Sequence, residues 1–249
     1  MKESEIKKVH EQEYKMLSEI NRLCKKNNIQ YFLAYGTALG AIRHNGFIPW
    51  DTDLDIMVDV ESYEALYYVL KQELNEEFIF REFRLDEKYD SLQPRVTLRN
   101  DNGLLMHVDI YPMIGAPYNK FMQKIFNKIT YFNQRLFFVK KVNADLNYKD
   151  KFRKRLIAKL VKKILYPISD KVLISINNRM KYKYSFDKSK YIYNLYGNYG
   201  QKEFIPKEWL DKVKYVQFEE AEFPVPYEYH KYLSHIYGDY MTPKKENYV

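Results

Sequence analysis

Cysteine is almost absent from this chain of 249 residues, which contains only Cys24. A single thiol excludes an internal disulfide and any zinc site built from several cysteines. Its position in a helix-like N-terminal stretch predicts a small buried core residue. The chain also lacks a run of about 18 uncharged apolar residues, which excludes a membrane-spanning helix. Its first residues contain no apolar signal-peptide core, and we therefore expect a cytoplasmic protein.

The charge is unevenly distributed along the chain. The formal net charge is +8, yet residues 120–190 hold 20 Lys and Arg against four Asp, which leaves the remainder net acidic. A strongly basic region favours an anionic partner. A cluster of aspartates near position 50 lies within this acidic remainder.

Strands interleaved with helices over the first 115 residues predict an α/β or α+β core. Apolar residues at helical spacing predict a first helix over residues 4–27. A short apolar run over 29–35 predicts a strand that enters a turn at Gly36. Further strands are predicted over 54–60, 78–84, 95–99, 104–111 and 213–218, and further helices over 38–43, 61–74 and 227–237.

The composition changes after residue 117 and suggests three parts. We expect an α/β or α+β catalytic core over residues 1–117, followed by a basic, largely helical insertion over 118–190. Residues 191–249 mix short strands with a closing helix and are expected to pack on the core. None of these parts is expected to be an independent domain.

Four carboxylates occur at odd positions beside one apolar strand: Asp51, Asp53, Asp55 and Asp59. Side chains at i and i+2 of a strand share a face, so Asp53 and Asp55 are predicted to project together. Two carboxylates this close raise each other's pKa unless a cation neutralises them. The pair therefore predicts a divalent metal site, for which Mg²⁺ is the natural ion and Mn²⁺ the alternative.

The neighbours of this pair have separate predicted roles. Asp109, within the alternating apolar run 106–111, is the candidate third carboxylate. Asp59 is expected to cap the helix that begins near residue 61. For Asp51 we consider two roles equally: a structural one in the loop, and a supporting one at the metal site. Trp50 is expected to pack beneath the metal-binding loop, with stacking on a nucleotide base as the alternative.

The small-residue turn upstream of the acids predicts a phosphate-binding site. Gly36 and Thr37 offer backbone N–H groups and a hydroxyl beside a helix N-terminus, and Gly40 belongs to the same turn. Arg43 and His44 add donors for phosphate oxygens, although the ring of His44 would equally suit a structural hydrogen bond. A phosphate cradle next to a metal site is typical of phosphoryl or nucleotidyl transfer from a metal-bound nucleotide.

These residues resemble the signature of the LicD family, bacterial phosphocholine transferases related to fukutin-type proteins. The resemblance implies an α+β protein with a nucleotidyltransferase-like fold and a mixed sheet. The resemblance rests on GTALGAIRH at 36–44 and FIPWDTDLDI at 47–56. HVDIYP at 107–112 resembles the family's third-carboxylate strand, and YGDYM at 237–241 with Pro243 resembles its closing motif. Thr52 stands where the family motif has an acid, and this difference leaves the Asp53 and Asp55 pair intact.

The resemblance implies transfer of phosphocholine from CDP-choline, or a similar CDP-linked alcohol, to a hydroxyl of a cell-surface glycan, with release of CMP. Lipopolysaccharide, capsular polysaccharide and teichoic acid are candidate acceptors. Asp53 and Asp55 would hold the metal, and Asp109 would complete its site and act as general base. The Gly36-Thr37 turn would bind phosphates, and Arg43 would stabilise the developing charge. An alternative is a nucleotidyltransferase that moves NMP to a small-molecule or sugar acceptor.

Residues 151–166 predict a basic amphipathic helix. Phe152, Leu156, Leu160 and Ile164 recur every fourth residue, and lysines and arginines fill most positions between them. A core helix with a solvated face is the commonest structure for this pattern. A lipid-linked glycan acceptor favours instead a peripheral helix on the anionic inner face of the membrane. We expect no nucleic-acid partner, because no such binding motif is present; a noncatalytic anionic-lipid or RNA-binding protein is the alternative from another class.

Overall fold

The computed structural model describes residues 3–100, 106–142 and 152–242. Its helices are α1 (Glu3–Lys26), α2 (Tyr35–His44), α3 (Val60–Glu73), α4 (Lys120–Lys141), α6 (Phe152–Leu165), α7 (Asp170–Lys181) and α8 (Tyr229–Tyr237), with 3₁₀ turns η1 (Gly200–Glu203) and η2 (Lys207–Leu210). The strands are β1 (Phe32–Leu33), β2 (Leu54–Asp59), β3 (Phe78–Arg81), β4 (Arg95–Leu98), β5 (His107–Ala116), β6 (Tyr191–Asn194), β7 (Phe204–Pro206), β8 (Val213–Phe218) and β9 (Ala221–Pro226).

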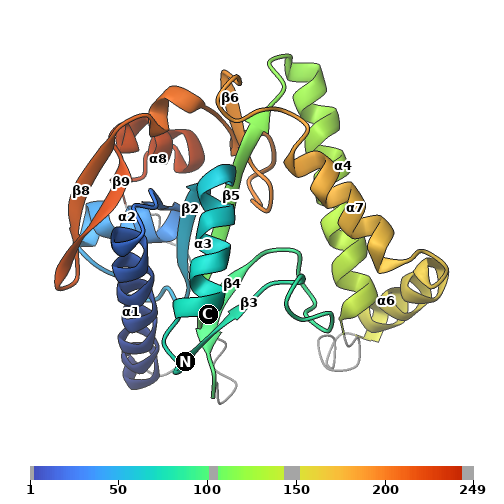
Figure 1. Ribbon diagram of the computed structural model, residues 1–249, viewed down its shortest axis with the longest axis horizontal. Helices are drawn as coiled ribbons and strands as arrows, with labels where there is room; N and C mark the ends of the chain where they lie inside the picture. The colour runs from blue at the N-terminus through green and yellow to red at the C-terminus, as the bar shows by residue number, and fades with distance from the viewer. Residues whose placement is uncertain (1–2, 101–105, 143–151, 243–249) are drawn as a thin grey trace.

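The described strands form a mixed seven-stranded sheet and a separate hairpin, as Figure 1 shows. Five strands follow the order β1-β2-β5-β4-β3. Outside this order, β6 pairs with β5 and β7 pairs with β6, while β8 and β9 form the hairpin. Strand pairs include the parallel pair β2 and β5 among antiparallel neighbours. This arrangement confirms the predicted α+β class.

Strand β5 is the centre of the sheet and pairs on both sides. It is almost wholly buried, as expected of a strand covered on both faces. Its first residues pair with β4 and its last with β6, so that β4 and β6 follow one another along the same edge. Residues 110–112 lie between these two partners, beside the β2 pairing on the other edge.

Helices α1 and α3 contact one another, and both contact β5. They cover the face of the sheet that is turned toward the viewer in Figure 1. The buried face of α1 includes Val9, Met16, Leu17 and Cys24, which follow the predicted helical spacing. The thiol of Cys24 is free and buried, and this confirms the prediction of a small core residue.

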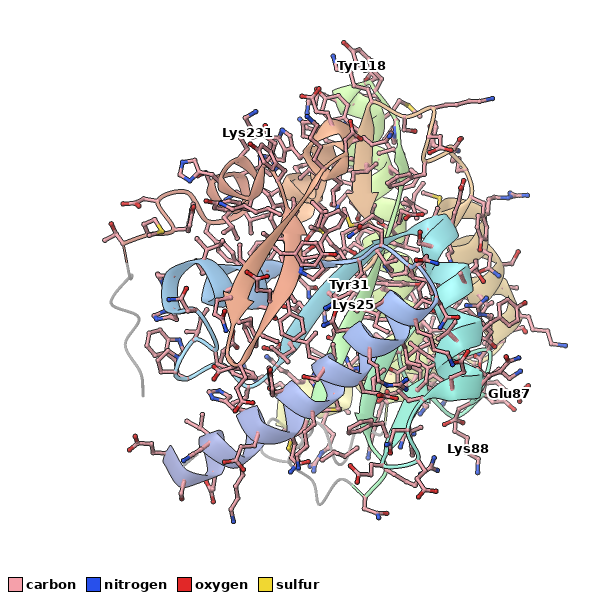
Figure 2. The ribbon with its side chains drawn as sticks, turned by 60° about the vertical axis from the view of Figure 1, so that its left-hand side comes forward. Lys25, Tyr31, Glu87, Lys88, Tyr118 and Lys231 are labelled. Carbon is pink, nitrogen blue, oxygen red and sulfur yellow. The ribbon has the colours of Figure 1, made fainter. Side chains whose placement is uncertain are left out.

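The region after β5 forms a helical layer beside the sheet. Figure 2 shows Tyr118, which precedes α4, at the top of the molecule and Glu87, in the β3–β4 connection, at its right-hand side in the lower half. Helix α4 spans this length, since its Lys141 Nζ donates to the backbone carbonyl of Glu87 at 2.5 Å. Among the described helices, none combines the length and the apolar character that a membrane span requires.

Helix α6 differs from the commonest interpretation of its sequence. Its apolar side chains at positions 152, 156, 157, 160 and 164 are exposed, and Ala158 is the one apolar residue recorded as buried among those with described side chains. A core helix with a solvated face is therefore not what the structure contains. The charges alone do not explain why so much apolar surface is left in contact with water.

Three predicted strands have wrong boundaries. The strand expected over 78–84 ends at Arg81. The strand expected over 29–35 is reduced to β1, because Tyr35 already begins α2 with a left-handed φ of 43°. Gly36 and Thr37 therefore lie in the first turn of a helix and not in a turn before it. Strand β5 continues past its predicted end to Ala116 in order to pair with β6, and residues 104–105 of that prediction lie outside the described residues.

The Asp59 cap on α3 is as predicted and offers a stability test. The Asp59 carboxylate accepts hydrogen bonds from the backbone N–H groups of Glu61 at 3.0 Å and Ser62 at 2.9 Å. Asp59→Ala should lower the free energy of unfolding by about 1 kcal/mol, because two helix N–H groups lose their acceptor. Urea denaturation measures this. Asp59→Asn, which retains a capping oxygen, should stay close to wild type; equal losses in both variants would contradict the capping role.

Candidate active site

Three charged residues form a row across adjacent strands of the sheet. Asp55 on β2 is in register with Asp109 on β5, and Asp109 is in register with Arg95 on β4. Neighbouring strands are about 4.8 Å apart, and registered side chains project to the same face. The two carboxylates are thus side by side in the sheet, and both are buried.

Arg95 was not predicted as a site residue. Of the charged groups that the structure describes, its side chain lies closest to Asp109. Its Nε atom is 2.9 Å from Asp109 Oδ1, and His107 Nε2 is 3.6 Å from Asp109 Oδ2. Burial opposes the charge of Arg95, but Asp109 raises its pKa above the ordinary value. The signal in the sequence was a cation opening an otherwise apolar strand, Arg95-Val96-Thr97-Leu98.

Asp51 and Asp53 bring two more acids to the start of α2. A Cβ atom added to Gly36 would lie 2.6 Å from Asp51 Oδ2, so this carboxylate needs the glycine in order to approach the helix. Burial, followed by a hydrogen bond with Asp53, raises the pKa of Asp51 to about 7. The backbone carbonyl of Asp51 also accepts from the ring of His10 at 2.7 Å. Asp51 therefore lies in the same acidic group as Asp53. A supporting role at a metal site stays a prediction for it.

Glu13 is a further acid that sequence reasoning missed. It is fully buried on the inner face of α1, and burial, followed by the charge of Asp53, raises its pKa to about 9. The backbone of His107 lowers this pKa to a smaller extent. The available signal was its spacing, since Glu13 occupies a core position between Val9 and Leu17 on the apolar stripe of α1.

Thr37 and Gly40 have structural contacts within the predicted phosphate turn. The Thr37 hydroxyl accepts a hydrogen bond from the backbone N–H of Asp55 at 2.7 Å, which ties α2 to β2. A Cβ atom on Gly40 would lie 2.4 Å from the carbonyl oxygen of Gly46, so Gly40 permits close packing of the following loop. Of these two residues, Thr37 is the one joined to the carboxylate row.

Arg43 and His44 lie at the other end of α2. Seven residues separate Arg43 from Gly36, a rise of about 10 Å along the helix. Arg43 donates to the ring of His44 at 2.9 Å and to the backbone carbonyl of Tyr240 at 3.0 Å. The contact with Tyr240 directs Arg43 toward the C-terminal segment, whereas His44 is exposed and contacts Arg43. Trp50 is 43% exposed, so a large part of its ring remains accessible to solvent.

The donor set of the row suits a hard divalent cation. Burial, followed by Asp53 and Asp109, raises the pKa of Asp55 well above its usual range, and Asp55 Oδ1 has no hydrogen-bond partner among the described residues. Mg²⁺ commonly binds one or two carboxylates and completes its shell with water and substrate phosphates. Within the described residues, no three or more acidic, histidine or cysteine side chains are arranged to hold a metal ion by themselves.

A strained tyrosine joins this row to the C-terminal part of the chain. Tyr35 has a left-handed backbone, which is uncommon for a bulky residue and costs on the order of 1–2 kcal/mol. Its hydroxyl donates to Glu203 and accepts from Asn194, while its backbone N–H donates to the Tyr232 hydroxyl at 3.2 Å. These buried contacts hold the first turn of α2 in place. Residues from η1, β6 and α8 therefore support the site.

The mixed sheet, with acids beside the first turn of a helix, places this chain in the nucleotidyltransferase-like class. Residues 28–156 match the family model described as LicD/FKTN/FKRP, nucleotidyltransferase domain, which is slightly more than half of the chain. The chain belongs to this family.

The similarity extends beyond that segment. The chain is 30% identical over 244 residues to the lipopolysaccharide cholinephosphotransferase LicD of Haemophilus influenzae (strain ATCC 51907 / DSM 11121 / KW20 / Rd), which covers 93% of this chain and 90% of the relative. It is also 44% identical over 59 residues to an uncharacterized protein of Rickettsia prowazekii (strain Madrid E), covering 24% of this chain and 22% of that protein. The resemblance seen in the sequence is therefore confirmed at the level of the family.

Glu203, which accepts the hydrogen bond from the Tyr35 hydroxyl, makes the stability of the fold depend on pH. Burial raises its pKa from 4.5 to about 7, against the opposing hydrogen bond from Tyr35. The folded state therefore binds the proton more tightly, and the associated stability is complete below pH 4.5 and is lost as the pH rises to about 7. The shift corresponds to a loss of about 3 kcal/mol in the free energy of unfolding.

Glu203→Gln should remove this dependence, because the amide does not titrate. Urea denaturation between pH 4.5 and pH 7 should give a flatter pH profile for Glu203→Gln than for wild type. The exposed Glu208→Gln is the matched control and should retain the wild-type slope. A Glu203→Gln profile parallel to that of wild type would show that Glu203 does not titrate in this range.

Proposed function

We propose that this protein transfers phosphocholine from CDP-choline, or a similar CDP-linked alcohol, to a hydroxyl of a cell-surface glycan. The acceptor oxygen forms a bond to the phosphorus that carries choline, and the bond from that phosphorus to CMP breaks. The observation that carries the proposal is the registered row of Asp55, Asp109 and Arg95 beside the first turn of α2. The extended similarity to a relative named as a lipopolysaccharide cholinephosphotransferase supports the choice of head group and makes lipopolysaccharide the first acceptor to test.

The residues of the row have complementary proposed roles. Asp53, Asp55 and Asp109 would hold Mg²⁺ or Mn²⁺, which would neutralise the charge of the donor's diphosphate. Asp109 accepts the proton of the acceptor hydroxyl, and Arg95 keeps its carboxylate in a fixed position through their ion pair. The first turn of α2 directs backbone N–H groups toward donor phosphates. Arg43 would reach a donor phosphate only by leaving its contact with Tyr240.

Labelling the two halves of the donor separately distinguishes this reaction from nucleotidyl transfer. CDP-choline labelled in the choline half should leave its label on the glycan, whereas label in the cytidine half should appear in free CMP. Cytidine label in the glycan product would overturn the proposal in favour of NMP transfer.

Asp55→Asn tests the carboxylate row. The variant should lower the turnover of CDP-choline by about a hundredfold or more, because a buried group that stabilises the transition state loses its charge. Turnover by wild type should likewise be lost on chelation with EDTA and restored by Mg²⁺. Asp59→Asn, an acid of the same strand used as a helix cap, should retain wild-type turnover. Wild-type turnover by folded Asp55→Asn would remove the basis of the proposal.

We further propose that α6 holds the protein against an anionic membrane on the cytoplasmic side, where a lipid-linked glycan would be met. Exposed side chains on this helix include Leu156, Leu160 and Ile164, the last of them 73% exposed. Exposed Lys154, Lys162 and Lys163 accompany them. An apolar stripe flanked by cations matches the interface of an anionic bilayer. Figure 1 places α6 at the outer edge of the helical layer, on the side away from the β8–β9 hairpin.

Liposome sedimentation tests this surface. Leu156→Ser combined with Leu160→Ser and Ile164→Ser should weaken binding to anionic vesicles by at least about tenfold, because apolar area no longer enters the bilayer. The fold should survive, since these side chains are exposed. Tyr215→Ser with Tyr227→Ser, two exposed positions elsewhere, is the control and should bind like wild type. Equal binding by all three proteins, or none at low salt, would contradict the membrane role.

A further inference from the structure

Five tyrosines gather beside the carboxylate row from separate parts of the chain. Tyr35 begins α2, Tyr111 belongs to β5, Tyr199 precedes η1, and Tyr232 and Tyr237 belong to α8. The ring centroids of Tyr35 lie 5.2 Å from Tyr111, 5.4 Å from Tyr199 and 6.3 Å from Tyr232. Tyr199 and Tyr237 are 5.6 Å apart. The cluster is therefore continuous from the sheet to α8.

The cluster is attached to the row at two points. Tyr111 follows Asp109 by two residues on β5, so the two side chains share a face of the strand. Tyr35 directly precedes Gly36, where Asp51 approaches the start of α2. Burial raises the pKa values of Tyr199 and Tyr237, and the charge of Asp55 raises them to a smaller extent. A ligand held at the row thus has aromatic rings next to it.

Two of these rings face outward. Tyr35, Tyr111 and Tyr232 are buried, whereas Tyr199 is 41% exposed and Tyr237 is partly exposed. The ring of Tyr199 stacks on Tyr35 at an interplanar angle of 20° and meets Tyr237 at 84°. Tyr199 and Tyr237 therefore make a corner of two nearly perpendicular rings, backed by buried aromatic side chains. We call this pair the tyrosine corner.

Hydrogen bonds hold the tyrosine corner in shape. The hydroxyls of Tyr199 and Tyr237 are 3.2 Å apart, and the backbone N–H of Tyr199 donates to Glu203 at 2.8 Å. Because both rings are already oriented, binding would cost little additional side-chain ordering. An exposed and pre-oriented pair of aromatic rings next to several carboxylates is suited to a cation that offers no hydrogen bonds.

We propose that the tyrosine corner binds the quaternary ammonium of the donor's head group and thereby selects choline over neutral alcohols. This inference rests on the proposed phosphocholine transfer and names the residues that would give it specificity. A trimethylammonium group has no N–H donor, so its recognition depends on aromatic faces and on negative potential. The corner supplies the faces and the acidic row supplies the potential. The head group would lie at the corner while its phosphate lies at the row.

The test compares CDP-choline with its neutral isostere, the CDP ester of 3,3-dimethylbutanol, in which carbon replaces the charged nitrogen. Wild type should bind CDP-choline about tenfold more tightly in isothermal titration calorimetry with Mg²⁺ present, and kcat/KM should show the same preference. Tyr199→Leu and Tyr237→Leu, which keep apolar bulk but lose the aromatic face, should bring both ratios close to one. They should leave binding of the isostere nearly unchanged.

Two controls separate a specific loss from a general one. Tyr199→Phe keeps the aromatic face and should retain most of the preference for CDP-choline. Tyr227→Leu changes an exposed tyrosine outside the cluster and should behave like wild type. Circular dichroism of each variant establishes that it is folded before binding is compared.

The outcomes distinguish this inference from the proposed function. Equal affinities of wild type for the two compounds, no binding of either, or an unchanged preference in both Leu variants would overturn the tyrosine corner. A preference that is lost in the Leu variants supports the corner even if no phosphocholine reaches a glycan. In that last case the transfer reaction would have failed while the recognition of the cation stands.

Discussion

The structure depends on the parallel register between β2 and β5, which sets two carboxylates side by side within a buried sheet. At a separation of about 5 Å and an effective dielectric of about 20, their repulsion is on the order of 3 kcal/mol. The strands nevertheless keep this register because Leu54, Ile56, Val108 and Ile110 are buried on the other face. Each of those side chains contributes roughly 1.5–3 kcal/mol. A slip of one residue in either strand would turn its two apolar side chains to the face that holds the carboxylates, so packing fixes the acids where electrostatics alone would separate them.

The C-terminal part of the chain is needed to complete what this register begins. The left-handed turn at Tyr35 directs the chain from β1 into α2 and brings Gly36 to Asp51. That conformation is held by Glu203, Asn194 and Tyr232, residues more than 150 positions later in the sequence. Local strain of this kind persists only where surrounding contacts determine it. The site is therefore a property of the whole fold and not of the acidic segment alone.

What the sequence could predict follows from the range of the interactions involved. Strand β2, helix α3 and the Asp59 cap were readable because their signals lie within a few adjacent residues. The pairing of β6 with β5 was not, since it joins segments about 80 residues apart and depends on the complete sheet. Glu13 and Arg95 were overlooked for a different reason. Glu13 is a charge at a position that the helical pattern of α1 assigns to the core, and such conflicts between local pattern and residue type mark functional sites. Arg95 shares a strand face with Thr97, so its charge resembles that of an ordinary polar face.

The uneven charge of the chain also bears on the need for a local cation at the row. Helix α6 carries many of the positive charges of the basic region, but Figure 1 shows it at the outer edge of the helical layer, away from β2 and β5. Exposed charges separated by more than about 8 Å are largely screened at physiological ionic strength. The lysines of α6 therefore contribute little to neutralising Asp55, and Arg95 is the nearby compensation that the described residues contain. One guanidinium beside Asp51, Asp53, Asp55 and Asp109 leaves an excess of negative charge that favours both a metal ion and a cationic head group.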